Sequence, residues 1–434
     1  MGQTTDPSRP GKDADVLKDP LFRAYLAGRL SSQLVTRMQA VVVGWHIYEF
    51  SHDPIALGYV GLAMFIPMVL FGLIIGDWAD RVSRSLIMTL SSLILTAASA
   101  GFLAMALMQV AEVWPYIALS AVFGIGAAFN RVALPSLLPQ ILGPERLAGG
   151  VAWGSSAGQF AIIAGPAAAG VLLLFGQDAA YGATALLSLL SAFIWWRMQI
   201  PPAVAPTAGT NGISMLERVV EGIQFVWRKP LILGAILLDL FAVLLGGVVA
   251  LLPVYAKDIL HAGPVGLGLL RAAPAVGAVL MAVTLARYPL KRYAGPIFLV
   301  AVGVHGLATL VFGLSENILM SCIALAIAGS ADMVSVVVRT TVVQLATPDA
   351  MQGRVNAVNQ VVVSASNELG DFRAGLMGGL IGVVPAVVTG CFAIVTVTAL
   401  GAWLCPPLRK LDRMEDAHKE AAAVEVEGAV AAKT

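Results

Sequence analysis

Charged side chains interrupt long apolar stretches of this 434-residue sequence at ten positions. A charge inside a bilayer costs about 2.5–3.5 kcal/mol on insertion scales, so a set of this size needs a function or a partner. A carboxylate in such a place can bind and release a proton, and an arginine can hold an anion; the structural alternative is an ion pair between two helices. The ten residues are Arg29, Arg37, Arg131, Asp239, Arg271, Asp332, Arg339, Glu368, Asp371 and Arg373.

The composition predicts where these charges lie. Hydrophobic residues make up 58% of the sequence and charged residues 12%, whereas a soluble domain averages roughly 45–50% apolar and about 25% charged. Most side chains must therefore face lipid or other helices, and we expect an all-α membrane protein. The net charge of +1 argues neither for nor against binding to nucleic acid, and we expect no nucleic-acid partner. The three cysteines follow no metal-binding or disulfide pattern, and we expect no metal and no cofactor.

The apolar stretches predict about twelve spanning helices, because a helix needs roughly 20 residues to cross a bilayer. We place them at residues 22–49, 55–76, 86–110, 114–138, 148–175, 179–199, 230–256, 264–287, 294–314, 317–342, 355–382 and 385–405. The expected organisation is an N-terminal tail (1–21), a six-helix bundle (22–199), a linker with a surface helix over 213–228 (200–229), a second bundle (230–406) and a C-terminal tail (407–434).

The distribution of lysine and arginine predicts the orientation. Nearly all of these residues outside the spans fall in alternate loops and the two tails, and the positive-inside rule then puts both termini in the cytoplasm. The two halves also match at a constant offset: Arg131 corresponds to Arg339, and Arg146 to Arg354. We therefore expect two parallel six-helix repeats in a bacterial inner membrane.

The loop between the second and third spans carries a motif. It reads Gly-Asp-Trp-Ala-Asp-Arg-Val-Ser-Arg over 76–84 and resembles the major facilitator signature, with Ser83 in place of the second glycine. The resemblance implies a conformational latch formed by Gly76, Asp80, Arg81 and Arg84. In such a latch Asp80 pairs with a helix N-terminus or an arginine of the same half and stabilises the outward-open state.

The fifth span carries small residues that resemble the antiporter motif of exporters, namely Gly158, Gly165, Pro166 and Gly170. The alternative interpretation of these residues is an ordinary small-residue packing face.

The eleventh span adds a more specific resemblance. Residues 347–359 and 366–372 are similar to the enterobactin-exporter-like branch of the major facilitators, also called the transmembrane secretion effector family, and the resemblance covers about residues 19–408. It implies proton-coupled efflux of a siderophore, a drug or another secondary metabolite by alternating access. Arg37 departs from the acidic residue that the resemblance leads us to expect near that place.

In this fold the first, fourth, seventh and tenth spans line a central cavity. The resemblance therefore places six of the charges there: Arg29, Arg37, Arg131, Asp239, Asp332 and Arg339. The cavity is then net positive and favours an anionic substrate. The candidate proton carriers are Asp239, Asp332, Glu368 and Asp371, with Glu368 and Asp239 preferred. For His46 and His305 we expect hydrogen bonds to neighbouring carbonyls.

Other functions remain open at this point. An importer or a lysophospholipid flippase shares the fold, and a polytopic membrane enzyme or a non-transporting sensor belongs to another class. The sequence contains no Gly-x-x-x-x-Gly-Lys and no His-Glu-x-x-His motif, so we expect no enzyme. The expected partners are a small molecule, protons and the lipid bilayer, and the expected state is a monomer.

Overall fold

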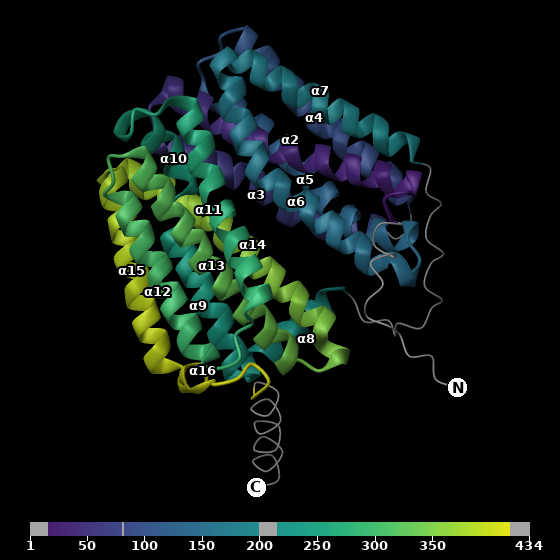
Figure 1. Ribbon diagram of the computed structural model, residues 1–434. Coiled ribbons are helices and arrows are strands. Elements are labelled where there is room, and N and C mark those ends of the chain that lie inside the picture. The colour runs from purple at the N-terminus through teal and green to yellow at the C-terminus, as the bar shows by residue number, and fades with distance from the viewer. Residues whose placement is uncertain (1–15, 80–81, 199–214, 417–434) are drawn as a thin grey trace. The chain divides into compact units, whose positions relative to one another are not determined.

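The computed structural model describes residues 16–79, 82–198 and 215–416, and the regular elements in these ranges are helices (Figure 1). The longer ones are α2 (Pro20–Ser51), α3 (Pro54–Ala79), α4 (Arg84–Leu107), α5 (Val113–Ile141), α6 (Pro144–Leu172), α7 (Gln177–Arg197), α8 (Met215–Arg228), α9 (Pro230–Gly246), α11 (Gly263–Arg287), α12 (Ala294–Gly313), α13 (Ile318–Ala346), α14 (Asp349–Ile381) and α15 (Val383–Leu404). The all-α prediction is confirmed, and the predicted surface helix in the linker is α8.

Within the described ranges, ten helical segments are long and apolar enough to cross a membrane. Two of the twelve predicted spans, α2 and α14, are not among these ten. They have 32 and 33 residues, which exceeds the roughly 20 that a bilayer requires, but their charged and polar side chains lower their apolarity. These are the helices that carry Arg29, Arg37, Glu368, Asp371 and Arg373.

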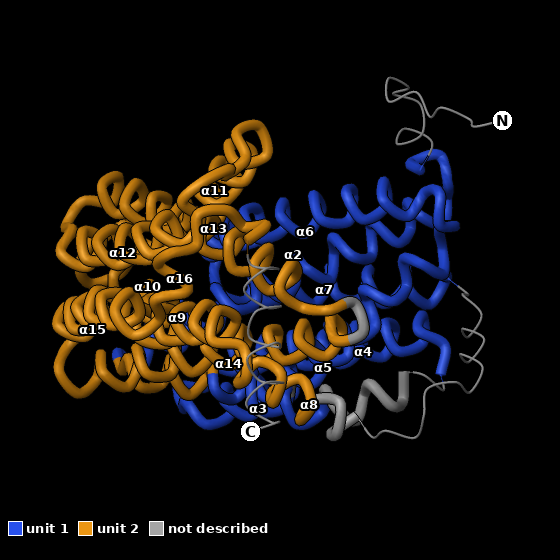
Figure 2. Tube along the Cα trace, turned by 90° about the horizontal axis from the view of Figure 1, so that it is seen from below, with its two compact units in different colours: residues 1–52, 62–207 blue, residues 53–61, 208–434 orange. Residues whose placement is uncertain are grey.

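The chain divides into two compact units, residues 1–52 with 62–207 and residues 53–61 with 208–434 (Figure 2). The division follows the linker except at the first turns of α3, which belong to the second unit. There the backbones of α3 and α14 touch: a Cβ atom on Gly375 would lie 2.8 Å from the amide nitrogen of Gly58. Glycine at this position therefore permits a helix contact that any side chain would prevent.

The two units use the same pairs of helices. In the first unit α2 packs on α6 and α7, and α4 packs on α5 and α7. In the second unit, the corresponding helices repeat this pattern, because α9 packs on α14 and α15, and α12 packs on α13 and α15. This shared pattern agrees with the repeat predicted from the matching arginines.

The seventh predicted span (230–256) corresponds to the apolar segment Pro230–Ile259, but the helix in it is broken rather than continuous. Helix α9 ends at Gly246 and is followed by a 3-10 turn (Val249–Leu251), the short α10 (Leu252–Val254) and a π-helical turn (Tyr255–Ile259). Gly246 and Gly247 stand at the break and Pro253 follows it. Both residue types weaken a helix at this point, because glycine is conformationally free and proline cannot donate a backbone hydrogen bond.

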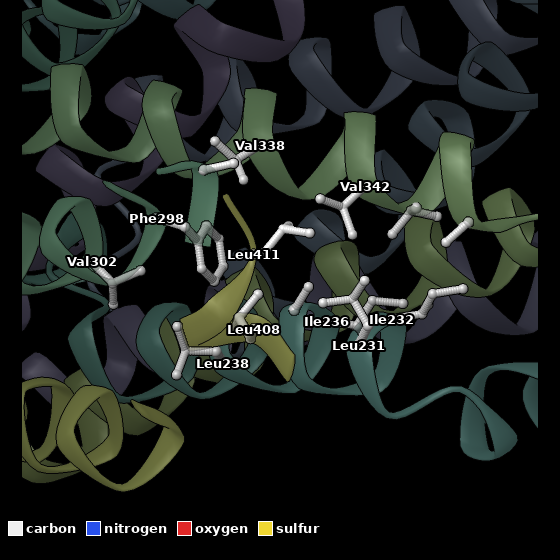
Figure 3. Packing of buried hydrophobic residues seen from close by; sticks show 14 of the residues in the cluster. Leu231, Ile232, Ile236, Leu238, Phe298, Val302, Val338, Val342, Leu408 and Leu411 are labelled. Atoms are coloured by element: carbon white, nitrogen blue, oxygen red, sulfur yellow. The ribbon is translucent and has the colours of Figure 1, made fainter. Parts of the chain in front are cut away.

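The core of the second unit joins α9, α12 and α13 to the end of the chain. Figure 3 shows Ile236 of α9, Phe298 of α12 and Val338 of α13 close to Leu408 and Leu411. The segment that carries these two leucines also caps α12, since the amides of residues 294 and 295 donate to the carbonyls of residues 412 and 411 at 3.0 and 2.9 Å. The last residues of the described chain thus satisfy helix-end donors that would otherwise lack partners.

The close contact between α11 and α13 depends on Gly329 of α13. This dependence leads to a first prediction. A Cβ atom on Gly329 would lie 2.0 Å from the carbonyl oxygen of Pro274, whereas nothing lies within 4 Å of a Cβ atom on Gly303 of α12. We expect Gly329→Ala to lower the free energy of unfolding by about 1–3 kcal/mol, since α11 must move to admit the methyl group. Thermal unfolding in detergent measures this, with Gly303→Ala as the matched control. Equal melting temperatures for the two variants would contradict the close contact.

Candidate functional site

An ion pair between α9 and α13 joins two of the predicted site residues. The Nε atom of Arg339 lies 3.4 Å from Oδ1 of Asp239, and the two side chains are only 5% and 7% exposed. Arg339 also donates from Nη1 to Oδ1 of Asn359 on α14, at 2.6 Å. Three helices thus meet at one arginine, whose charge is neutralised inside the second unit.

Two other titratable side chains lie close enough to Asp239 to interact with it electrostatically. They are Asp332, one of the predicted residues, and His305. Asp332 is half-buried on the same helix as Arg339. His305 is held by its Nδ1 atom, 3.1 Å from the carbonyl oxygen of Ala328, as the sequence led us to expect. The cluster therefore draws on α9, α12, α13 and α14.

A second charged group holds the break in span seven. Nη2 of Arg373 donates to the carbonyl oxygen of Leu245 at 2.5 Å, and Oδ1 of Asp371 accepts from the amide of Ala250 at 3.3 Å. In an unbroken helix, this carbonyl and this amide would bond to backbone groups four residues away. The two α14 side chains replace these missing bonds, and Arg271 of α11 interacts electrostatically with Asp371.

We call Arg271, Asp371 and Arg373 the clamp, because they hold the break in span seven. Their charges are explained by this structural role without a substrate. Backbone groups that lack a partner in a membrane cost several kcal/mol, and irregular backbone is tolerated there only when it is buried in protein or lines a wet cavity. The backbone of α14 also approaches closely, since a Cβ atom on Gly247 would lie 2.8 Å from the carbonyl carbon of Gly370. Asp371 thus has a positioning role in the structure, beyond the proton-carrier role that the sequence predicts.

In the first unit, Arg29 of α2 lies against glycines of α6. Its Nη1 atom donates to the Tyr25 hydroxyl at 3.1 Å, and its guanidinium lies 3.5–3.7 Å from the sites where Cβ atoms on Gly158 and Gly154 would be. Its Nε atom is buried and lacks a hydrogen-bond partner. Among the described residues no carboxylate lies within ion-pair distance of Arg29, so its charge is not neutralised there.

The glycines of the antiporter-like motif thus adjoin the arginines of α2. Arg37 packs its Cβ atom 2.6 Å from the Cβ position of Gly165, and Arg29 lies beside Gly158. Helix α6 continues through Pro166 without a break. The small residues serve as a packing face, and the side chains packed beside Gly158 and Gly165 include the charged Arg29 and Arg37.

Arg131 of α5 does not repeat the environment of Arg339. The offset that matches these two arginines aligns Ser31 with Asp239 and Val151 with Asn359. The first unit therefore carries neither a carboxylate nor an amide at the positions aligned with Asp239 and Asn359. Arg131 is exposed in its unit, whereas Arg339 is buried.

His46 differs from the prediction. Its Nδ1 atom lies 3.2 Å from the hydroxyl of Tyr181 rather than beside a carbonyl, and its ring is packed edge-on against Tyr116 and Phe50. The residue is a buried member of an aromatic cluster near the end of α2.

The latch motif lies partly outside the described residues. Asp80 and Arg81 are outside them, and Gly76 is described only as part of α3, while Arg84 begins α4 directly after Ser83.

The structure does not bring together all four carboxylates that the sequence proposed as proton carriers. Asp239 and Asp332 belong to the Arg339 cluster, whereas Glu368 and Asp371 lie on α14, with Oε2 of Glu368 4.0 Å from the Cβ position of Gly61.

Sequence reasoning missed Asn359 and the role of Arg373. Asn359 belongs to the motif that carries the family resemblance, so a signal was present, but an amide in a polar motif does not name its partner. The sequence identified Arg373 only as a charged residue in a predicted span. Its bond to the Leu245 carbonyl could not be predicted, because the break in span seven was not predicted.

Comparison with known proteins gives the same fold. The sequence profile described as transmembrane secretion effector matches residues 15–433. The chain is 29% identical over 379 residues to the enterobactin exporter EntS of Citrobacter koseri, covering 83% of this chain and 85% of that one, and 28% identical over the same length to the EntS of Escherichia coli O81, with the same coverage.

Solved structures agree at the level of fold. A bacterial homolog of the human lysosomal transporter Spinster, in an inward-facing and unoccupied conformation, has a TM-score of 0.67 at 17% identity, with 96% of this chain and 99% of that one covered. The xylose transporter XylE from E. coli, in an inward-open conformation, has a TM-score of 0.66 at 13% identity, covering 93% and 99%.

The buried ion pair generates a prediction about stability. Asp239→Asn or Arg339→Gln alone leaves one charge without its partner, and breaking a buried pair costs about 3–5 kcal/mol. We expect the double variant to lose less than the sum of the two single losses, because neither charge then remains. The measurement is a double-mutant cycle of unfolding free energies in detergent. Strictly additive losses would show that the two side chains do not interact.

The clamp generates a prediction of its own. Arg373→Met removes the donor to the Leu245 carbonyl, and we expect a loss of about 1–3 kcal/mol because a buried acceptor is left without a partner. Arg373→Lys keeps a charged donor and should lose less. Hydrogen exchange at residues 245–252 distinguishes this local effect from general destabilisation, and unchanged exchange in the Met variant would refute the clamp.

Proposed function

Because the chain belongs to the transmembrane secretion effector family, a branch of the major facilitator transporters, we propose that it exports a small anionic molecule by proton-coupled alternating access. The curated relatives are named as enterobactin exporters, which supports a siderophore or a related secondary metabolite as the substrate. We place the protein in the bacterial inner membrane with both termini in the cytoplasm and α2 and α14 as its remaining spans.

The proposal that the substrate is an anion rests on a difference between two arginines: one is paired with a carboxylate and the other is not. Arg339 is neutralised by Asp239, whereas Arg29 has a tyrosine hydroxyl and a glycine-lined face beside it and a buried Nε atom that lacks a partner. A guanidinium in a low-dielectric site attracts a planar anion strongly, and a carboxylate or catecholate matches its paired donors. We assign Arg29 as the substrate contact in the first unit, with Arg37 and Arg131 adding positive charge.

Proton and substrate move in opposite directions in an exchanger, and this requirement decides which carboxylates can carry the proton. A proton on Asp239 would release Arg339 and increase its attraction for an anion, so proton and anion would bind together. Exchange requires the opposite: the proton must act on the empty transporter and drive its return. We therefore propose that Glu368, and Asp371 at the break of span seven, carry the proton, and that Asp239 and Arg339 hold α9 to α13.

The alternating-access step follows from this division of roles. The substrate binds from the cytoplasm to the arginine-rich first unit, the two units rearrange, and the substrate leaves on the outer side. Protonation of an α14 carboxylate from outside then permits the return. The Asp80 latch and the monomeric state belong to the same proposal.

The test uses inverted membrane vesicles with an acidic interior. We expect a catecholate siderophore to dissipate the pH gradient in wild-type vesicles, and not with Glu368→Gln, because the amide cannot carry the proton. Arg29→Gln should raise the substrate KM at least tenfold with a smaller effect on kcat, while Arg29→Lys retains part of the affinity. Arg23→Gln, an exposed arginine at the start of the same helix, is the matched control.

Other outcomes discriminate between the functions. Substrate accumulation on the outer side of right-side-out vesicles without loss of the gradient would exclude proton exchange. Movement of a labelled lysolipid between leaflets in place of siderophore transport would identify a flippase, and inward siderophore transport would identify an importer.

A further inference from the structure

Helix α8 of the linker is fixed to the second unit by one of its faces. Oε2 of Glu221 pairs with Nη1 of Arg354 on α14 at 2.5 Å. A Cβ atom on Gly222 would lie 2.9 Å from the backbone oxygen of Arg354, and Val226 is buried in the hydrophobic cluster of the unit. The ion pair and the glycine contact together fix the rotation of α8 about its own axis.

The flank that this rotation leaves uncovered is apolar. Val220, Ile223 and Trp227 are 43%, 40% and 66% exposed, and their spacing of three and four residues puts them on one side of the helix. The other uncovered flank carries the exposed Gln224 and Arg228. The helix therefore has three sides: one docked on protein, one apolar and one polar.

The position of α8 in the chain determines its depth. It ends at Arg228, and α9, whose sequence is apolar enough to span a membrane, begins at Pro230. Only Lys229 separates the two helices, so Trp227 must lie at the level where the span enters the bilayer. Tryptophan is enriched at that level because its ring is apolar and its N–H is polar.

We propose that the flank formed by Val220, Ile223 and Trp227 inserts into the bilayer interface, at the boundary between phospholipid headgroups and acyl chains. The polar flank then faces water, as in helices that lie in the interface plane. The Glu221–Arg354 pair directs the apolar flank to lipid by setting the rotation of the helix. This inference concerns the linker and holds whether or not the protein exports a siderophore.

The first experiment measures depth in nanodiscs of phosphatidylcholine and phosphatidylglycerol. The three native cysteines are replaced by alanine, and an environment-sensitive fluorophore is attached through Trp227→Cys or, as the matched control on the polar flank, Gln224→Cys. We expect lipids that carry a spin label near the headgroup end of the acyl chain to quench the probe at 227 at least threefold more than the probe at 224. Aqueous iodide should show the reverse order.

Two results would overturn the proposal. Equal iodide quenching at both positions would place the apolar flank in water, and protection of the probe at 227 from both quenchers would show that protein covers it. A second measurement retains the native cysteines and compares wild type with Trp227→Phe in nanodiscs of brominated lipid. The proposal requires that the Phe variant lose a lipid-quenchable part of the tryptophan emission, and an unchanged quenched fraction would refute it.

Discussion

Polar groups inside a bilayer have no water to bind, so each must find its partner within the protein, in a wet cavity or on a ligand. This constraint is most visible at the break of span seven. The break frees the carbonyl of Leu245 and the amide of Ala250, and α14 supplies Arg373 to the one and Asp371 to the other. The irregular segment is stable only because those two side chains bond its free backbone groups. The same two hydrogen bonds offset the cost of placing the charged side chains there.

The same constraint separates the remaining arginines into two kinds. Arg339 meets a carboxylate and an amide from two other helices, and its charge is neutralised within its own unit. Arg29 meets a hydroxyl and a face of glycines, which offer it no negative charge from the described residues. The two units thus share their helix pairs but differ in their charges. This difference is the basis of our proposal that the first unit binds the anion and that α14 of the second unit carries the proton.

Small residues make this arrangement possible. Glycines on α6 admit the arginines of α2, glycines on α13 admit the backbone of α11, and glycines on α14 admit the first turns of α3 and the broken end of α9. Lipid offers little hydrophobic drive for helix association, so close approach of backbones supplies much of the attraction between spans.

The sequence by itself determined the all-α class, most of the helix boundaries to within a few residues, the helix in the linker and the set of charges within the apolar stretches. These follow from apolar run lengths and composition, which are local properties. Only the tertiary structure decided how the charges divide, because a partner such as Asn359 for Arg339 comes from another helix and leaves no local pattern. The break at Gly246 was likewise hidden, since its glycines and proline occur equally in continuous spans. Only the packing of α14 against that break gives its free backbone groups a partner.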